Sequence, residues 1–304
     1  MKNIQKYYII QGIYRNEIEV KRKLKRIAVI PNDGKDIGLV VTKSLVEFLS
    51  GRAEVCMDES YRVLGLDVSY TSPEKIYDGA DYAIVLGGDG TILQQAAQCA
   101  RKSVPVLGIN LGKIGFMTEI EPCDMEKAVS SLLSGDFITE KRMMIRAEII
   151  RSGVSRFSFH ALNDIVVSKS VGEKLINIEL STNGEAVNRY TADGLIIATP
   201  TGSTGYSISA GGPVVDPSMR LLVATPICAH MLSVRSAVLA SDKTMKIKIS
   251  SEAGGSEAVV TADGDIQGYI KETDEVLITE SEYDFKLIKI GNQSFYDTLI
   301  SKLS

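Results

Sequence analysis

Histidine and cysteine are scarce in this 304-residue chain. Its two histidines, His160 and His230, and its four cysteines stand far apart, and no Cys-x-x-Cys pair occurs. This spacing excludes the common zinc sites and gives no disulfide framework. Neither histidine belongs to a recognisable nucleophile motif, so a structural or ligand-contact role is expected for each. Isolated thiols are the rule in a reducing cytosol, and we expect a cytoplasmic protein.

An excess of positive charge is also missing. The chain has 34 Lys and Arg against 38 Asp and Glu, a formal net charge of −4. Without a basic field, neither a nucleic acid nor a membrane surface is favoured as a partner. The one basic cluster, residues 21–26, precedes an apolar segment and is expected to be a solvated lead-in to a strand.

Long apolar runs are absent as well. Residues 7–10 are apolar but too few for the hydrophobic region of a signal peptide. The longest uncharged stretch, residues 194–215, has the length of a membrane span but is full of Gly, Ser, Thr and Pro. We therefore expect neither a signal peptide nor a membrane helix.

Two common nucleotide-binding motifs do not occur. Gly-x-x-x-x-Gly-Lys-Ser/Thr and Gly-x-Gly-x-x-Gly are found nowhere in the chain. The first cradles phosphates in P-loop proteins, and the second binds the pyrophosphate of a dinucleotide. A P-loop kinase and an ordinary dinucleotide dehydrogenase are both disfavoured.

The hydrophobic pattern indicates a globular protein of two domains. Hydrophobic residues make up 44% of the chain and charged residues 24%, which suits a chain with a large core. In the first 140 residues, short apolar runs alternate with segments of helical periodicity. This alternation predicts an α/β N-terminal domain with a parallel sheet, residues 1–140. Strands are expected at residues 27–30, 82–86 and 104–109, and helices at 37–49, 91–101 and 125–133.

Beyond residue 140 the hydrophobic period changes to two. Residues 176–180 alternate strictly, and Asn183-Gly184 is a strong hairpin turn. We predict a β-rich C-terminal domain at residues 141–290 and a terminal helix within residues 291–304. Further strands are expected at residues 145–150, 157–168, 195–199, 246–249, 258–262 and 275–290.

Two glycine-rich segments follow predicted parallel strands. Residues 87–90 read Gly-Gly-Asp-Gly, and glycines at such a sheet edge let the backbone approach a phosphate closely. The N-terminus of the following helix adds partial positive charge. The alternative is a tight turn in which Asp89 caps that helix. The second segment, residues 107–116, allows either close backbone packing or a ligand loop with Phe116 against an aromatic base.

Hydroxyl groups and carboxylates gather beside other apolar runs. Residues 199–207 read Thr-Pro-Thr-Gly-Ser-Thr-Gly-Tyr-Ser, an uncharged block suited to binding ribose, phosphate or adenine through hydrogen bonds. A polar loop is the alternative. The pair Asn163-Asp164 and the single Asp193 precede apolar runs, and for each the alternative is a solvated strand edge.

Together these segments resemble the NAD kinase family. The matching stretches are Gly-Gly-Asp-Gly at 87–90, Gly-Ile-Asn-Leu-Gly-Lys-Ile-Gly-Phe at 108–116, Asn-Asp at 163–164, and Ala-Asp-Gly through Gly-Gly-Pro at 192–213. The first stretch is shared with lipid kinases and phosphofructokinases, whereas the last is far more specific. The resemblance covers residues 27–300.

The resemblance implies a kinase that phosphorylates the adenosine-ribose 2′-hydroxyl of NAD to give NADP. It implies ATP or inorganic polyphosphate as the donor, with a divalent metal ion, Mg²⁺, as cofactor. It further implies a homodimer or homotetramer whose site lies between the domains and borrows residues from a neighbouring subunit. The terminal helix would pack back on the first domain.

The resemblance also assigns roles to individual residues. Asp89 is the catalytic residue, which orients and deprotonates the hydroxyl. Its main contribution is expected to be geometry, because a free Asp titrates near about 3.9 and is a poor base for an alcohol. No residue is assigned to the metal. The residues assigned to the phosphate donor are Gly87, Gly88 and Asn110, and those assigned to NAD are Gly90, Phe116, Asn163, Asp164, Asp193, Thr204, Gly205, Tyr206 and Ser209.

The chain departs from the family pattern at a few positions. Gly205 stands where Ala is usual, the segment around His230 lacks two prolines, and Asp265 replaces a common Gln. His230 and the 263–265 loop are therefore the weaker site candidates. Two rivals remain: a lipid or sugar kinase, which would not need the 199–213 block, and a non-catalytic dinucleotide sensor, which would not need Asp89.

Overall fold

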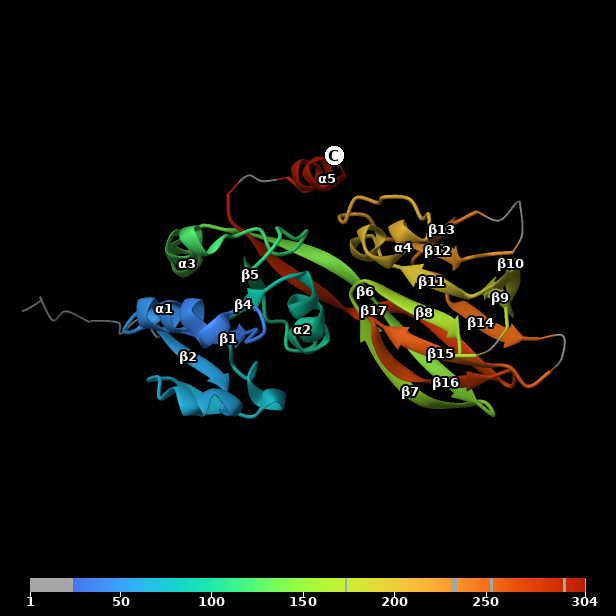
Figure 1. Ribbon diagram of the computed structural model, residues 1–304, viewed down its shortest axis with the longest axis horizontal. Coiled ribbons are helices and arrows are strands. Elements are labelled where there is room, and N and C mark those ends of the chain that lie inside the picture. The colour runs from blue at the N-terminus through green and yellow to red at the C-terminus, as the bar shows by residue number, and fades with distance from the viewer. Residues whose placement is uncertain (1–23, 173, 231–234, 252–253, 292–293, 304) are drawn as a thin grey trace, which may run out of the picture.

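The computed structural model describes residues 24–172, 174–230, 235–251, 254–291 and 294–303 (Figure 1). Residues 7–10 and 21–23, on which two of the sequence expectations fall, lie outside the described residues. Figure 1 shows an elongated molecule, with the N-terminal strands and helices at one end and long antiparallel strands at the other. Within the described part of the chain, no helix is long and apolar enough to cross a membrane.

Parallel strands form the N-terminal part in the order β5-β4-β1-β2-β3. They are β1 (Lys25–Pro31), β2 (Ala53–Asp58), β3 (Ser69–Thr71), β4 (Tyr82–Gly87) and β5 (Val106–Asn110). The covering helices are α1 (Val40–Leu49), α2 (Asp89–Arg101) and α3 (Met125–Ser134). The predicted α/β domain with a parallel sheet is confirmed. Strands β2 and β3 were not predicted, because one is interrupted by a charged residue and the other has only three residues.

Side chains of β4 alternate between two cores. Val85 belongs to the cluster that includes Ile92 of α2, whereas Ile84 belongs to the cluster that includes Leu45 of α1 and Val129 of α3. All five are fully buried. A strand covered on both faces reads as a continuous apolar run, which is why the sequence signal for β4 is strong. The polar residues needed for chemistry can then stand only where the strand ends.

The rest of the described chain is predominantly β, as predicted. Its strands are β6 (Ile138–Arg151), β7 (Val154–Ala161), β8 (Asp164–Lys169), β9 (Ile176–Thr182), β10 (Glu185–Ala192), β11 (Gly194–Ala198), β12 (Leu221–Ile227), β13 (Ala237–Ala240), β14 (Met245–Ser250), β15 (Glu257–Ala262), β16 (Asp265–Lys271) and β17 (Asp274–Lys289). One antiparallel sheet has the order β13-β12-β11-β8-β15-β16. The hairpin between β9 and β10 turns at Asn183 and Gly184, both with positive φ, as the sequence predicts.

The prediction of a single strand at residues 157–168 is wrong. Two strands, β7 and β8, occupy it and belong to different sheets. Between them, the N–H groups of Leu162 and Asn163 donate to the Asp263 carboxylate at 2.8 and 2.7 Å. These bonds take the place of ladder bonds, so the chain can leave one sheet and enter the other.

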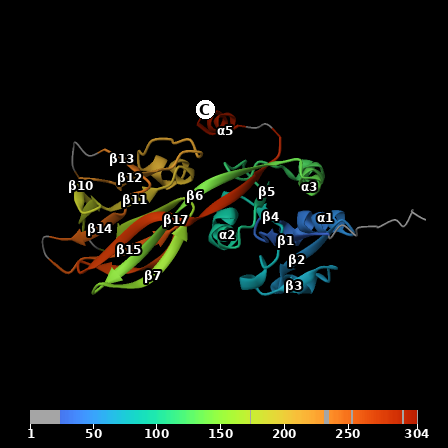
Figure 2. The same ribbon diagram turned by 180° about the vertical axis from the view of Figure 1, so that it is seen from behind.

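The long strand β17 joins the two parts of the molecule. It pairs with β6 from Asp274 to Lys289 and runs parallel to β5 where Leu287 faces Val106. One sheet therefore continues through both parts, and Figure 2 shows β6 and β17 crossing between them. The boundary expected at residue 140 falls inside β6. After β17 comes the terminal helix α5 (Phe295–Leu303).

Candidate active site

The Gly-Gly-Asp-Gly turn links the end of β4 to the start of α2. A methyl group at Gly87 would lie 2.3 Å from Thr91 Oγ1, and one at Gly88 would lie 2.5 Å from Lys35 Nζ. Side chains at these two positions would therefore displace their neighbours. The first N–H groups of α2 have no acceptor within the helix, which makes its N-terminus an anion-binding position.

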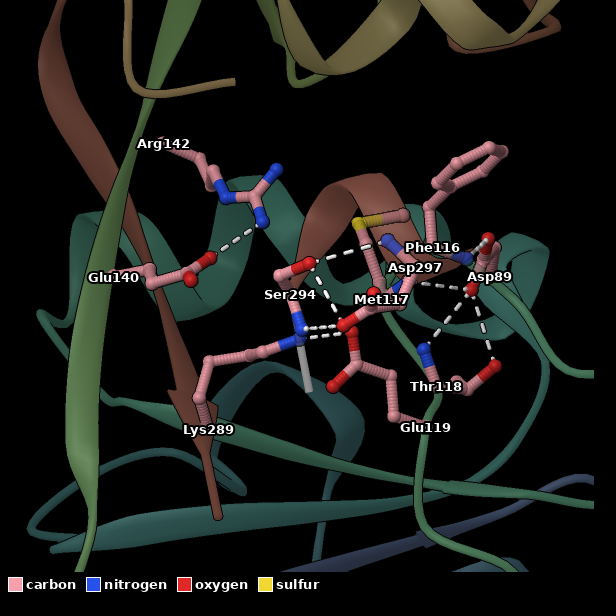
Figure 3. A network of polar contacts seen from close by, with 10 residues as sticks. All are labelled: Asp89, Phe116, Met117, Thr118, Glu119, Glu140, Arg142, Lys289, Ser294 and Asp297. Carbon is pink, nitrogen blue, oxygen red and sulfur yellow. Dashed lines mark hydrogen bonds and ion pairs between the residues drawn. The ribbon is translucent and has the colours of Figure 1, made fainter. Parts of the chain in front are cut away.

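The Asp89 carboxylate bonds to the loop after β5 rather than to its own helix. Its Oδ2 accepts the N–H of Phe116 at 2.7 Å, and its Oδ1 accepts the N–H groups of Met117 and Thr118 at 3.0 and 3.1 Å. The Thr118 hydroxyl adds a bond of 3.1 Å (Figure 3). A methyl group at Gly115 would lie 1.9 Å from Asp89 Oδ1. The alternative in which Asp89 caps α2 is therefore wrong, since the N-cap residue is Gly88 and the Asp89 carboxylate bonds to residues 116–118.

Asn110 lies beside Gly87, because β4 and β5 pair at these two residues. Asn110 is 3% exposed, and its Nδ2 donates to the Gly112 carbonyl at 2.9 Å. Its Oδ1 is buried and has no hydrogen-bond partner among the described residues. A free amide oxygen is an acceptor and suits a hydroxyl group or a cation rather than a bare phosphate oxygen.

Asn163 and Asp164 lie at the start of β8, over the carboxylate of Asp263. Asp263 Oδ1 accepts their N–H groups at 2.7 and 3.1 Å. Asn163 Oδ1 is buried without a partner among the described residues, and the Asp164 side chain is buried as well. Both residues line a pocket of about 420 Å³ together with Leu93 and Tyr206. Leu93 stands one turn after Asp89 on α2, so Asp89 and the pocket share one face of that helix.

Burial makes both carboxyl groups of this pocket weak acids. It raises the pKa of Asp164 to about 7, and the neighbouring Asp263 adds to the rise. Burial also raises the pKa of Asp263, to about 6, although the three N–H bonds that it accepts oppose the shift. Two carboxyl groups so close to one another resist being ionised together. Near neutral pH the pair therefore holds a proton for part of the time.

The hydroxyl-rich block packs against Asn163. It forms a 3-10 turn, Thr201–Thr204, and the short helix α4 (Tyr206–Ser209). A methyl group at Gly202 would lie 2.0 Å from the Asn163 carbonyl oxygen, so only glycine fits there. Tyr206 lines the pocket, whereas Thr204, Gly205 and Ser209 do not, although all four are at least partly exposed.

Asp193 does not line this pocket, but the next residue, Gly194, pairs with Ser168, which does. Asp193 precedes β11, whose other end pairs with Asp164, and five residues of strand correspond to roughly 16 Å. Its carboxylate forms an ion pair with Lys169 at 2.7 Å. The weaker candidate His230 is exposed, and its N–H bonds to the Thr191 carbonyl. His160 bonds to the Ser281 hydroxyl at 2.9 Å, and burial lowers its pKa, which fits a structural role.

The terminal helix covers Phe116. The rings of Phe116 and Phe295 are 5.7 Å apart, and Lys302 Nζ lies 4.6 Å from the centre of the Phe116 ring. Tyr296 donates to Asp216 at 2.6 Å, so α5 touches both parts of the molecule. A buried ion pair between Glu119 and Lys289 anchors the loop after β5, whose residues 116–118 bond to Asp89 (Figure 3). The ring of Phe116 therefore packs against α5, and its backbone N–H donates to Asp89.

Sequence reasoning missed two contributors to this site. Lys35, in the loop after β1, reaches the backbone of Gly88. Thr118 contributes a hydroxyl and an N–H group to Asp89. The available signal for Lys35 is its place in the polar loop after β1, a strand that pairs with β4. Asp263, which holds the backbone of residues 162–164, belongs to the 263–265 loop, one of the weaker candidates of the sequence.

The glycine turn at the start of α2 suits the phosphates of a nucleotide, and the carboxylate beside it suits a hydroxyl acceptor, a combination typical of a phosphotransferase. The chain matches the ATP-NAD kinase N-terminal domain over residues 19–137 and the ATP-NAD kinase C-terminal domain over residues 162–290. It belongs to the NAD kinase family, and it is an enzyme of that phosphotransferase class.

Named relatives support the same assignment. An NAD kinase from Lachnoclostridium phytofermentans is 40% identical over 285 residues, which cover 92% of this chain and 99% of the relative. An NAD kinase from Caldanaerobacter subterraneus subsp. tengcongensis is 39% identical over 284 residues, with the same coverage. Yeast NADH kinase complexed with NADH has a TM-score of 0.84 and 25% identity, covering 93% of this chain and 88% of its own. An NAD kinase from Archaeoglobus fulgidus in complex with ATP has a TM-score of 0.71 and 28% identity, covering 91% and 98%.

Proposed function

We propose that this NAD kinase transfers a phosphoryl group from ATP to the adenosine-ribose 2′-hydroxyl of NAD, with Asp89 as the catalytic residue. The observation that carries the proposal is the position of Asp89 between the glycine turn and the loop at 115–118. Asp89 Oδ2 accepts one bond from the protein, which leaves it capacity to accept a second from a substrate hydroxyl. A lipid or sugar kinase could share the Gly-Gly-Asp-Gly turn, but it would not need the block at residues 199–213.

In the proposed step, the hydroxyl oxygen forms a bond to the γ-phosphorus. The bond from that phosphorus to the β,γ-bridging oxygen breaks, ADP leaves, and the hydroxyl proton passes to Asp89. Phosphoryl transfer has a loose transition state, so positioning contributes more than base strength. The three N–H bonds to Asp89 hold its carboxylate in one orientation, which supports that role.

NAD is assigned to the pocket lined by Asn163, Asp164 and Tyr206. The unpartnered Asn163 Oδ1 and the Asp164 carboxyl group would accept bonds from ribose hydroxyls. Thr204, Gly205 and Ser209 would contact the adenosine half, and Gly90 would lie beside the reacting hydroxyl. Phe116 would lie near the adenine and Asp193 near the nicotinamide. Asp193 lies near Ser168, at the other end of the pocket from Asp164, so a ligand would have to extend along β8 to reach it.

A divalent ion, Mg²⁺, is proposed as the cofactor and would offset charge on the donor phosphates. No group of three or more His, Cys, Asp or Glu is placed to hold a metal within the described residues. Mg²⁺ in such enzymes is bound mainly by phosphates and water. The unpartnered Oδ1 of Asn110 fits it as a protein ligand beside Gly87 and Gly88. Full activity in excess EDTA would contradict this assignment.

The assembly and location are proposed from the family resemblance. A homodimer or homotetramer would let a neighbouring subunit complete the site, and light scattering that shows an active monomer would contradict this. Four unpaired thiols support a cytoplasmic location.

The deciding experiment incubates the purified chain with MgATP and one acceptor at a time. NAD should be converted to NADP, whereas diacylglycerol and fructose 6-phosphate should not be phosphorylated. Parallel reactions with inorganic polyphosphate in place of ATP define the donor. Binding of NAD without turnover would support the dinucleotide sensor instead.

A further inference from the structure

Lys35 lies against the glycine turn on the side away from Asp89. Strands β1 and β4 are neighbours, with Pro31 facing Leu86, so the loop after β1 adjoins the turn after β4. A methyl group at Gly88 would lie 2.5 Å from Lys35 Nζ. The ammonium group therefore occupies the space that a side chain at position 88 would fill.

The backbone of this loop is tied to both neighbouring helices. Lys35 donates its N–H to the carbonyl of Asn32 at 3.0 Å, and Asn32 Nδ2 donates to Thr91 Oγ1 of α2 at 2.8 Å. The Asp36 carboxylate accepts the N–H and hydroxyl of Thr42 in α1 at 2.8 and 2.6 Å. The Cα of Lys35 is thus fixed relative to the turn, and only its side chain has to be ordered by a ligand.

The charge on Lys35 has no counter-ion within the described part of the chain. Among the described residues, no carboxylate forms an ion pair with Lys35, although exposed lysines elsewhere in the chain have such partners. Its ammonium adjoins the first N–H groups of α2, which also attract an anion. Two sources of positive potential meet at this place, and the one acidic residue in the first turn of α2, Asp89, directs its carboxylate to the loop after β5 instead.

The sheet order separates the charges of the turn. In the order β5-β4-β1, the Asp89 carboxylate bonds to the loop after β5, whereas the Lys35 ammonium comes from the loop after β1 and lies against Gly88. A hydroxyl acceptor belongs beside the carboxylate, and a polyanionic donor belongs beside the ammonium. We propose that Lys35 is a donor-binding residue, which holds the phosphates of ATP or polyphosphate on the β1 side of the turn. The inference rests on the proposed function and adds a residue and a direction of approach to it.

The test compares three variants of the full-length enzyme with wild type. Lys35→Met removes the charge and keeps the length of the side chain, whereas Lys35→Arg keeps the charge. Lys43→Met is the matched control, because Lys43 is an exposed lysine of α1 that bonds to the Gly38 carbonyl and does not reach the turn. Initial rates are measured with ATP varied at saturating NAD and with NAD varied at saturating ATP. Calorimetric titration with MgATP in the absence of NAD measures donor binding directly.

For Lys35→Met we expect the KM and Kd for MgATP to rise about tenfold, which corresponds to one lost charge-assisted contact. The KM for NAD should stay within about twofold, Lys35→Arg should recover most of the donor affinity, and Lys43→Met should match wild type. Equal MgATP affinity in Lys35→Met and wild type would overturn the inference. An equal loss for NAD and MgATP would also overturn it, because a structural role would disturb both. A wild-type enzyme without NAD kinase activity would contradict the proposed function instead, and the calorimetric comparison would still decide the role of Lys35.

Discussion

The backbone N–H of Phe116 donates to Asp89 Oδ2 at 2.7 Å, which joins two glycine-rich motifs that lie 27 residues apart in the chain. The next two N–H groups of the loop donate to the other oxygen of the same carboxylate. Asp89 therefore has two tasks. It organises the loop that carries Phe116, and it is the proposed acceptor for the substrate hydroxyl.

The variant Asp89→Asn affects both tasks, the acceptance of the proton and the ordering of the loop. The variant loses the proton acceptor, and general base catalysis typically contributes 10²–10⁴-fold, so kcat should fall by about that factor. An amide also turns one oxygen into an NH₂ group, which then faces an N–H donor of the loop. A bond of this kind is worth about 1–3 kcal/mol, so Tm should fall as well. Steady-state kinetics and a thermal melt on the same sample measure both effects.

Thr118→Val is the control for the organising task. It removes the hydroxyl bond to Asp89 and keeps the carboxylate and the three N–H bonds. Its kcat should stay within about threefold of wild type. If Thr118→Val lowered kcat as much as Asp89→Asn does, loop order rather than proton transfer would explain both losses.

Gly115→Ala should abolish most activity while the protein stays folded. The added methyl group would lie 1.9 Å from Asp89 Oδ1, so either the carboxylate or the loop has to move. A displacement of about 1 Å in an active site can cost about 10²-fold in rate. Gly112→Ala is the matched control, because it lies in the same loop and has no neighbour within 4 Å of the added methyl group. Similar kcat values for the two variants would show that the fit between Gly115 and Asp89 has no part in catalysis.

Asp164→Ala should weaken NAD binding more than it slows the saturated enzyme. Asp164 lines the pocket beside Asn163 but lies on a different element from Asp89. Loss of a hydrogen bond to the buried carboxyl group costs about 1–3 kcal/mol, so the KM for NAD should rise roughly 5- to 100-fold. An unchanged KM for NAD would remove Asp164 from the binding site.

The sequence predicts features that depend on neighbouring residues, but not contacts between residues far apart in the chain. The strand β4 and the turn after it could be predicted, because a doubly buried strand and a glycine cluster are local patterns. The crossing from β7 to β8 could not, because it depends on Asp263, about a hundred residues further along the chain. The same range hides the position of Lys35 beside Gly88 and the bonds between Asp89 and the loop at 116–118. Residue types at the site could be predicted from motifs, but their contacts depend on the assembled sheet.

The carboxyl pair Asp164 and Asp263 should make the stability of the enzyme depend on pH. Burial raises the pKa of Asp164 from an ordinary value near 3.8 to about 7, so the folded state binds more protons than the unfolded state between those values. Stability should therefore fall as pH rises from about 4 to 7, and the penalty should be complete above the folded pKa. Asp263, with a pKa raised to about 6, adds a second penalty of the same sign over pH 4 to 6.

Asp164→Asn removes the cost of ionising the buried group. At pH 8 the variant should be more stable than wild type by roughly 2–4 kcal/mol, and near pH 4 the two should be equally stable. Asp67→Asn, at an exposed aspartate of the N-terminal part, should give no such difference at either pH. Urea unfolding of the three proteins at both pH values measures the effect. A stability gain for Asp164→Asn that is the same at pH 4 and pH 8 would mean that Asp164 is not held as a weak acid, and the pocket would then have to be more hydrated than its burial indicates.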